Sequence, residues 1–515
     1  MQVFKGKIIV ADELNTVASY LVEKEGRVAY IGDELPMAFA DLDVIDLGPG
    51  ALLPAFVDTY NHFSAYSIDR TTLDISTAES NTEALDMIRQ YAGTVKEQFV
   101  VVYGATAHSV LEGKLITKDQ LDAVCHDKPV IAFKYDGHSC VINTAFINMI
   151  KDKAKNLRGY HESTGEMNQE AFAVVNEIWA RSLSTRKVID AMVHTADHVA
   201  EMGIGMIQSA SGMGFVRDMN MDMERSVANG FDNGMQMRVA FQTNDVSRAM
   251  KKDARRVVHG ALDGTFGSAD AALSYPYENT DDRGILYFTD DELIDFCKKA
   301  NRAQMQIAIH AVGDAAFNQA AKAIAAALED FPRYDHRHMI IHACMPDKEA
   351  IDICSKYHIF LSVQPTFIKW KMESKEYLNS ILGTERVKTL NPIGTYLAQG
   401  IKVCISSDAP STEPNPMEWI HNLCNPYIPS QAIDIYDAIR MCTYNGCLSS
   451  FDERDRGTLE IGKIADMVVL DQDPYTIPKE KLNTINVKEL YLNGKPYRHS
   501  KSTPMATMLR GMFPQ

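Results

Sequence analysis

The chain has 515 residues, of which 46% are hydrophobic, so it is long enough for one large folded domain and a smaller one and is not a disordered protein. Its 68 acidic and 52 basic residues give a formal charge of −16, which disfavours nucleic acid and anionic membrane surfaces as partners. The chain shows no apolar run of about 18 residues, no secretory pattern at its start and no paired spacing among its nine cysteines, so we expect a cytoplasmic protein with reduced thiols.

Short stretches near both ends of the chain alternate apolar and polar residues, as antiparallel strands do. The first of these are KIIV, SYLVEKEGRVAYIG and DVIDLG, and the last are GTLEIGKIADMVVLD and VKELYLNGKPY. Turn residues separate them. The economical interpretation is one small β-sandwich domain built from residues 1–52 and 455–515.

Between these ends, in residues 53–454, continuous apolar runs alternate with amphipathic helical segments. Such runs are typical of parallel strands covered by helices, and their number predicts an α/β fold, a TIM (β/α)8 barrel, with an insertion around residues 65–200. The runs are FVVVYGAT, PVIAFKY, GIGMIQSA, MRVAFQT, RVVHGALDG, MQIAIHAVGD, HMIIHACM, IFLSVQP and IKVCISSDAP.

Polar side chains close several of these runs. His310 and His342 end two of them, Asp408 follows a third, and His62 ends an early run. The carboxyl ends of barrel strands meet on the catalytic face, so we expect these four residues together, although each alone is more often structural. Imidazole and carboxylate donors suit one or two divalent ions such as zinc or manganese, which would supply a hydroxide nucleophile at neutral pH. The pattern therefore predicts a hydrolase.

A series of motifs follows in the order found in the amidohydrolase superfamily, and the chain resembles its branch of long enzymes that includes the N-substituted formamide deformylases. The motifs are PAFVDTYNH, KYDGHSCVIN, ALDGTFGSADAAL, IAIHAVGDAAF, IIHACMPD, SVQP, ISSDAP, CTYNG and GTLEIGKIADMVVLD. The resemblance spans nearly the whole chain. It implies a metal-dependent TIM barrel flanked by a small β-sandwich.

The resemblance also implies roles for the residues at the strand ends. His62 matches the second histidine of the first-strand pair, and His310 and His342 match the ligands of strands five and six. Asp408 matches the strand-eight aspartate, which in the family contacts the metal and carries the proton from the attacking water to the leaving group. A carboxylate can do both because general base and general acid are one group before and after a proton transfer.

Two positions depart from the family pattern. Tyr60 stands where the first histidine is usual, and a neutral phenol is a poor metal ligand, so the metal pair is reduced or Tyr60 instead donates a hydrogen bond to a developing oxyanion. His259 stands where lysine is usual. It is either a replacement ligand or a rim histidine bonded to Asp263 or water.

Further site residues are expected from the same comparison of motifs. Glu170 is a candidate metal ligand, with an exposed acid in the first turn of a helix as the alternative. His138 is expected to polarise a carbonyl or hold its oxyanion. The residues expected to contact substrate are Lys134, Asp263, Gln364 and Trp370. Lys134 in particular suggests an anionic or oxygen-rich substrate group, and Trp370 has simple packing as its alternative.

The leading hypothesis is attack of metal-bound hydroxide on a carbonyl carbon of a small substrate, expected to be cyclic, by default at the C–N bond of an amide. A second hypothesis is hydrolytic C–C ring opening of a cyclic 1,3-diketone, as in dihydrophloroglucinol cyclohydrolase, because Tyr60, His138 or Lys134 could stabilise an enolate. A third is a metal-poor protein that binds a small molecule for regulation. The resemblance also allows a homo-oligomer, since superfamily members often assemble.

Overall fold

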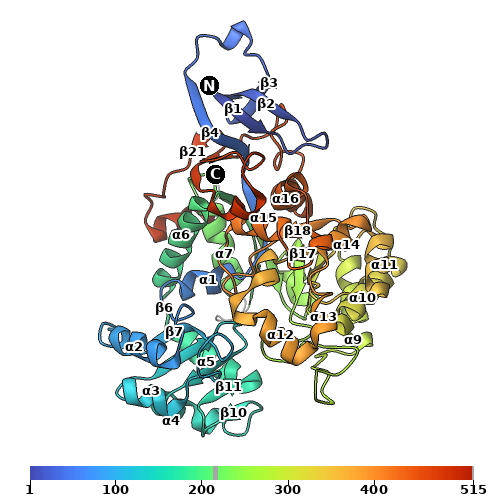
Figure 1. Cartoon of the computed structure of the whole chain (residues 1–515). Helices are drawn as coiled ribbons and strands as arrows, with labels where there is room; N and C mark the ends of the chain where they lie inside the picture. The colour runs from blue at the N-terminus through green and yellow to red at the C-terminus, as the bar shows by residue number, and fades with distance from the viewer. Residues whose placement is uncertain (213–218, 513–515) are drawn as a thin grey trace.

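The structure, a computed structural model, describes residues 1–212 and 219–512 and folds into three parts (Figure 1). Strands from both termini form one sheet at one end of the molecule. A barrel of eight parallel strands forms the middle, and a third sheet, inserted after the first barrel strand, lies at the opposite end from the terminal sheet.

The terminal sheet has seven strands in the order β21-β20-β19-β4-β1-β2-β3. They are β1 (Gln2–Ile9), β2 (Val17–Lys24), β3 (Arg27–Gly32), β4 (Val44–Pro54), β19 (Met467–Leu470), β20 (Val487–Leu492) and β21 (Lys495–Pro496). Phe4 of β1 contacts Tyr491 of β20 with ring centroids 5.1 Å apart, although two strands separate them in the sheet. The sheet therefore folds over its own apolar core.

The middle part is a nearly closed parallel barrel, as predicted. Its strands are β5 (Phe56–Asn61), β12 (Ile204–Ser211), β13 (Gln236–Gln242), β14 (Arg256–His259), β15 (Gln306–Ala311), β16 (Met339–His342), β17 (Phe360–Val363) and β18 (Val403–Ile405). The first and last strands meet where Thr59 Oγ1 donates to Ile405 O at 2.8 Å. Parallel strands connected by helices form such a barrel because each helix returns the chain over the outer face of the sheet.

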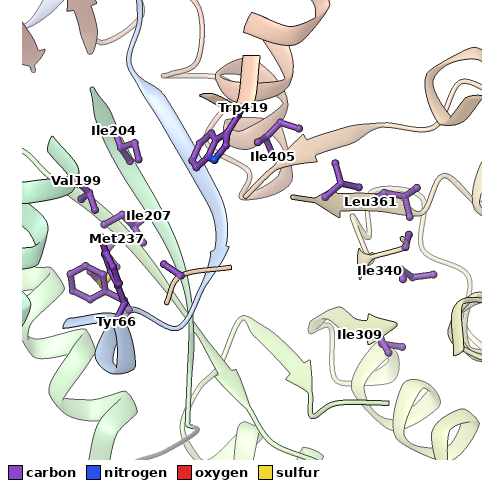
Figure 2. Packing of buried hydrophobic residues seen from close by; sticks show 14 of the residues in the cluster. Tyr66, Val199, Ile204, Ile207, Met237, Ile309, Ile340, Leu361, Ile405 and Trp419 are labelled. Atoms are coloured by element: carbon purple, nitrogen blue, oxygen red, sulfur yellow. The ribbon is translucent and has the colours of Figure 1, made fainter. Parts of the chain in front are cut away.

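Helices cover the outside of the barrel and the loops at its carboxyl end. They include α1 (Phe63–Asp69), α6 (Thr185–Glu201), α7 (Met219–Gly230), α8 (Val246–Lys251), α9 (Asp290–Arg302), α10 (Asp314–Asp330), α11 (Lys348–Tyr357), α12 (Lys375–Leu382), α13 (Thr384–Val387), α14 (Ile393–Ala398), α15 (Pro416–Cys424), α16 (Ile435–Cys442), α17 (Tyr444–Ser449) and α18 (Pro504–Met512). Figure 2 shows outward side chains of the strands, such as Ile207, Ile309 and Ile405, in one buried cluster with Trp419 of α15. This packing is the main core of the protein.

The assignment of FVVVYGAT and PVIAFKY to the barrel is wrong. These segments form two strands of the inserted sheet, which has the order β10-β11-β9-β8-β7-β6. Its elements are β6 (Leu73–Asp74), α2 (Asn81–Ala92), β7 (Val100–Ala105), α3 (Lys118–Val124), β8 (Val130–Lys134), β9 (Ser139–Ile142), α4 (Thr144–Ala154), β10 (Tyr160–His161), β11 (Glu166–Asn168) and α5 (Gln169–Ser182). Because β7 and β8 run parallel and are buried, their sequence pattern is the same as that of barrel strands.

The cysteines and the helices bear on the expected environment of the protein. All nine cysteines are free thiols. Within residues 1–212 and 219–512 no helix is both long and apolar enough to cross a membrane.

Asp58 fastens the seam between the first and last barrel strands. Its buried carboxylate accepts hydrogen bonds from Ser407 N at 2.9 Å, from Ser407 Oγ at 2.6 Å and from Asn61 Nδ2 at 2.9 Å. Burial raises the pKa of Asp58 to about 6, against the opposing effect of these donors. The seam is thus held by an acid that is costly to bury and is compensated by three hydrogen bonds.

We predict that Asp58→Ala lowers the free energy of unfolding by about 3 kcal/mol, because it leaves buried donors unpaired. Urea unfolding followed by circular dichroism measures the shift. The control is Asp86→Ala, which removes an exposed carboxylate paired with Arg89 and should cost less than about 1 kcal/mol. Equal midpoints for the two variants would contradict the role of Asp58.

Candidate active site

The inner face of the barrel directs two histidines to its carboxyl end. Tyr60 and Ala308 belong to the layer of side chains that fills the barrel. Since side chains alternate along a strand, His62 and His310, two residues further on, face the same interior. Both line a cavity with a volume of about 830 Å³ that lies between this end of the barrel and the inserted domain.

His342 reaches the same cavity through an unusual backbone conformation. Strict alternation would turn it outward with Ile340, because Ile341 faces the barrel interior. The φ angle of His342 is instead 74°, in the left-handed region that non-glycine residues seldom adopt. Its ring lies against His310, with centroids 4.5 Å apart. Asp408 has a similar φ of 58°, and such strain is typical of functional positions.

Each of the three histidines has one ring nitrogen engaged away from the cavity. His62 Nδ1 donates to Ala210 O at 3.4 Å, and His342 Nδ1 donates to Gln364 Oε1 at 2.8 Å. His310 Nε2 is buried and lies 3.4 Å from Asp263 Oδ1. The second nitrogen of His62, Nε2, lies beside the hydroxyl of Tyr60, and all three rings line the cavity. Metal-binding histidines in proteins are usually oriented in this way, by a carbonyl or carboxylate behind the ring.

The protonation of two of these rings favours metal binding. Burial lowers the pKa of His62 to about 4 and lowers the pKa of His342 well below its usual value, and the neighbouring His310 contributes to both shifts. The two rings are therefore neutral at pH 7, with a lone pair available to a cation. His310 differs: burial lowers its pKa, but Asp263 outweighs this effect and the net shift is upward.

Tyr60 and Asp408 complete the cluster. Tyr60 OH lies 3.2 Å from His62 Nε2, and Asp408 Oδ1 lies 3.9 Å from the same nitrogen. Burial raises the pKa of Asp408 to about 7, although His310 acts to lower it. Burial and the charge of Asp408 raise the pKa of Tyr60 far above its usual value, so Tyr60 is a neutral hydrogen-bond donor.

The donors of this cluster fit a divalent ion in kind. Three histidines oriented by their second nitrogen and one carboxylate are typical ligands of zinc and related metals. As the side chains are placed, no three His, Cys, Asp or Glu residues of the described ranges are close enough to hold one ion together.

The structure does not bring His259 or Glu170 into this cluster. His259 Nδ1 donates to Gly260 O at 2.8 Å, and its ring packs between Phe288 and Phe296, each with its centroid 4.6 Å away. The carboxylate of Glu170 is partly exposed and pairs with Arg158 at 2.8 Å. Both histidine and glutamate are thus occupied by local partners, and neither lines the cavity.

Lys134 is held by the protein itself. Its buried ammonium contacts Asp136 Oδ2 at 2.9 Å and donates to Ser268 Oγ at 3.0 Å and Gly267 O at 3.1 Å. Three donors are therefore already used. Lys134 lines the cavity, but its ammonium has no N–H group left for the anionic substrate group that the sequence suggested.

The other expected substrate contacts divide into two groups. Asp263 is fully buried and accepts hydrogen bonds from Ala272 N, Val312 N and Gly313 N, so it supports the loops around His310 and does not line the cavity. Gln364 lies behind His342 and orients its ring. Trp370 and His138 do line the cavity.

The cavity is also lined by residues that no motif indicated. Asp69 is the last residue of α1, and Glu373 is the last residue of the 3-10 helix η3 (Lys371–Glu373). Burial raises the pKa of Glu373 to about 7, with the charge of Asp136 as a further cause. Neither acid follows a strand, so the rule that locates polar residues at strand ends could not find them.

Comparisons with known proteins agree with this architecture. The sequence profile described as "Amidohydrolase family" matches residues 43–497. The putative amidohydrolase YtcJ of Bacillus subtilis is 25% identical over 484 residues, covering 88% of this chain and 90% of the relative. The N-substituted formamide deformylase of Arthrobacter pascens is 21% identical over 543 residues, covering 96% and 97%. An uncharacterized metal-dependent hydrolase from Pyrococcus furiosus superposes with a TM-score of 0.73 at 22% identity, covering 92% of this chain and 99% of that structure.

The family match covers far more than half of the chain, and it spans the barrel and parts of the terminal sheet. The structural likeness, at 22% identity, supports the fold. The hypothesis of a metal-poor regulatory binding protein is therefore set aside. This chain belongs to the amidohydrolase family and is a hydrolase.

Proposed function

We propose that this hydrolase cleaves the C–N bond of a small amide by adding water to its carbonyl carbon. The observation that carries the proposal is the position of Asp408, whose buried carboxyl lies 3.9 Å from His62 Nε2 in a cluster of three oriented histidines. The proposed ligands of a divalent ion are His62, His310, His342 and Asp408. When bound, such an ion activates water and polarises a carbonyl oxygen.

Asp408 suits the proton transfers that amide hydrolysis requires. A pKa raised to about 7 by burial lets this carboxyl exchange a proton near neutral pH. We assign it the removal of a proton from water and the delivery of that proton to the leaving nitrogen. An amine leaves poorly without this proton, so one group in reach of both atoms serves both halves of the reaction.

Tyr60 and His138 are proposed to act on the carbonyl oxygen. Tyr60 carries its proton at neutral pH, and its hydroxyl lies beside the nitrogen of His62 that would hold the ion. A donor at this place can stabilise the negative charge that develops on the oxygen. His138 lines the same cavity from the loop after β8. The Arthrobacter pascens relative, named for its action on N-substituted formamides, supports an amide as substrate.

A second candidate reaction is favoured by Tyr60 alone. Hydrolytic C–C cleavage of a cyclic 1,3-diketone releases an enolate. A hydrogen-bond donor stabilises the enolate oxygen, and this reaction has no leaving nitrogen that must be protonated. A phenol whose pKa is raised by burial and by Asp408 is such a donor. Amide cleavage remains the first proposal because Asp408 fulfils its additional requirement for a proton on the leaving atom.

We predict that protein purified without chelators holds one divalent ion per chain and that His310→Ala loses it. One ion is expected because Tyr60 is a neutral phenol, and because the ring of His259 packs between Phe288 and Phe296 and does not line the cavity. Elemental mass spectrometry gives the count and the identity of the metal. His194→Ala is the control, since His194 is exposed and pairs with Asp190 on a helix surface. Equal metal content in the two variants would contradict the assigned ligands.

We predict that Asp408→Asn lowers kcat for amide hydrolysis by about 10²- to 10⁴-fold, because an amide side chain cannot accept and return a proton. The measurement is steady-state turnover with a panel of N-substituted formamides and cyclic amides, on protein whose metal content has been checked. The control is Asp282→Asn, another acid of the cavity lining. Unchanged turnover in Asp408→Asn would sink the proposal.

We predict that Tyr60→Phe keeps its metal and lowers kcat by roughly 10²-fold, the effect of losing one oxyanion donor. The same protein is assayed with amides and with cyclic 1,3-diketones such as 1,3-cyclohexanedione. Turnover of amides alone removes the ring-opening candidate. Turnover of diketones alone replaces the first proposal with the second.

A further inference from the structure

The cavity beside the proposed catalytic cluster has an acidic lining. Among the described residues it contains one Lys or Arg side chain, Lys134, which is neutralised by Asp136. The remaining carboxyl groups are Asp69, Glu166, Asp270, Asp282, Glu373 and Asp408. A hollow lined by one sign of charge attracts ligands of the opposite sign.

Asp69 is an acid of this lining whose carboxyl no protein group of the described residues compensates. In residues 1–212 and 219–512 its side chain has no hydrogen-bond donor or cation as partner, and only its backbone carbonyl is bonded, to Thr72 Oγ1. Asp270, by comparison, accepts from Thr265 N at 2.8 Å. Burial alone raises the pKa of Asp69 to about 8. The side chain of Asp69 is partly buried, and a carboxyl without a partner is costly there, so a ligand that compensates it binds with a gain.

Aromatic side chains of the inserted domain surround the same end of the cavity. Phe133 packs against Trp179, with ring centroids 5.0 Å apart, and against Phe172 at 6.0 Å. Tyr103 is the direct neighbour of Phe133 in the pairing of β7 with β8. All four rings line the cavity. Ring faces and a carboxylate together are the usual surroundings of an organic cation.

The chain path brings Asp69 to these rings. Five residues after Asp69, Asp74 of β6 pairs with Tyr103 of β7. The pKa of Tyr103 is raised chiefly by burial, next by the charge of Asp69, and also by Asp408. Tyr103 therefore lies within electrostatic range of both acids, and all three residues line the same cavity.

We propose that this end of the cavity is a subsite for a cationic group of the substrate, an ammonium or substituted ammonium, with Asp69 as its counter-ion and the rings of Tyr103, Phe133 and Trp179 as its walls. The subsite deepens the proposed amide hydrolysis and rests on it: the cation binds at Asp69 while the amide carbonyl lies at His62 and Asp408. The substrate is then an amide of a diamine or of another amine-bearing compound. This charge is the reverse of the one that Lys134 suggested from the sequence.

The test compares three small ligands of nearly equal shape, benzylammonium, benzyl alcohol and benzoate, binding to the metal-loaded enzyme by calorimetry. We expect benzylammonium to bind at least about tenfold more tightly than benzyl alcohol, and benzoate to bind most weakly. Asp69→Asn should remove the preference for the cation, a loss of about tenfold, and leave the affinity for benzyl alcohol nearly unchanged.

Two further variants separate the subsite from general effects. Asp152→Asn makes the same change in net charge at a fully exposed position of the inserted domain, and it should keep the preference for benzylammonium. Phe133→Leu removes one ring without changing the charge and should weaken benzylammonium more than benzyl alcohol. Thermal melting of each variant shows whether it is folded.

The proposal is overturned if wild-type enzyme binds benzylammonium and benzyl alcohol equally, or if folded Asp69→Asn keeps the full preference. Because binding is measured without turnover, the result is independent of the reaction. Failure to hydrolyse any amide would overturn the proposed function and leave the cation subsite standing. Amide hydrolysis without cation selectivity would do the reverse.

Discussion

The geometry of the site depends on the closure of the barrel between its first and last strands. Asp408 N donates to Tyr60 O at 3.0 Å, and His62 N donates to Ala409 O at 2.8 Å. These two backbone hydrogen bonds join the segment that carries Tyr60 and His62 to the segment that carries Asp408. Asp58 reinforces the junction by accepting two hydrogen bonds from Ser407. A barrel that opened here would keep its other strand pairs and lose the relation between a proposed ligand and the proposed acid.

The inserted domain determines the environment in which this cluster works. Lys134 and Asp136 of that domain bind the barrel loop at Ser268, and the ring of His108 stacks on Tyr377 with centroids 3.8 Å apart. These contacts hold the domain over the carboxyl end of the barrel. Asp408 lies buried in the wall of this cavity, and its burial raises its pKa to about 7. Lys134 thus helps to hold one wall of the cavity in place, and its charge is neutralised by Asp136.

The sequence was sufficient for the parts of the protein that follow a regular period. Alternation along apolar strands brings His62 and His310 to one rim, and the barrel itself is confirmed. The period cannot show which sheet a buried parallel strand joins, and this is why β7 and β8 were misplaced. Nor can it show a turn of the backbone such as the one at His342, which reaches the cavity only because its φ is positive.

Side chains with several candidate partners were the least predictable part of the site. Glu170 has the spacing of a ligand, but Arg158 lies nearer and binds it with two hydrogen bonds. His259 stands at the end of a barrel strand, but a carbonyl and two phenylalanine rings occupy its surroundings. Such competition is decided by atoms within a few ångströms, and the chain order does not contain that information. Asp69 was not predicted, because it belongs to no motif. Unlike those of Glu170 and His259, its side chain has no protein partner among the described residues.

The buried acids of the cavity connect ligand binding to proton release. Burial raises the pKa of Asp69 to about 8, and those of Glu373 and Asp408 to about 7, so each is partly protonated near neutrality when nothing positive is close. A divalent ion beside Asp408, or an organic cation beside Asp69, favours the charged form and drives the proton off. The cost of burying these carboxyls is then offset by the ligand instead of by the fold. A cavity built in this way is poorly suited to anions, and it becomes most stable when it holds the positive groups on which the proposed reaction depends.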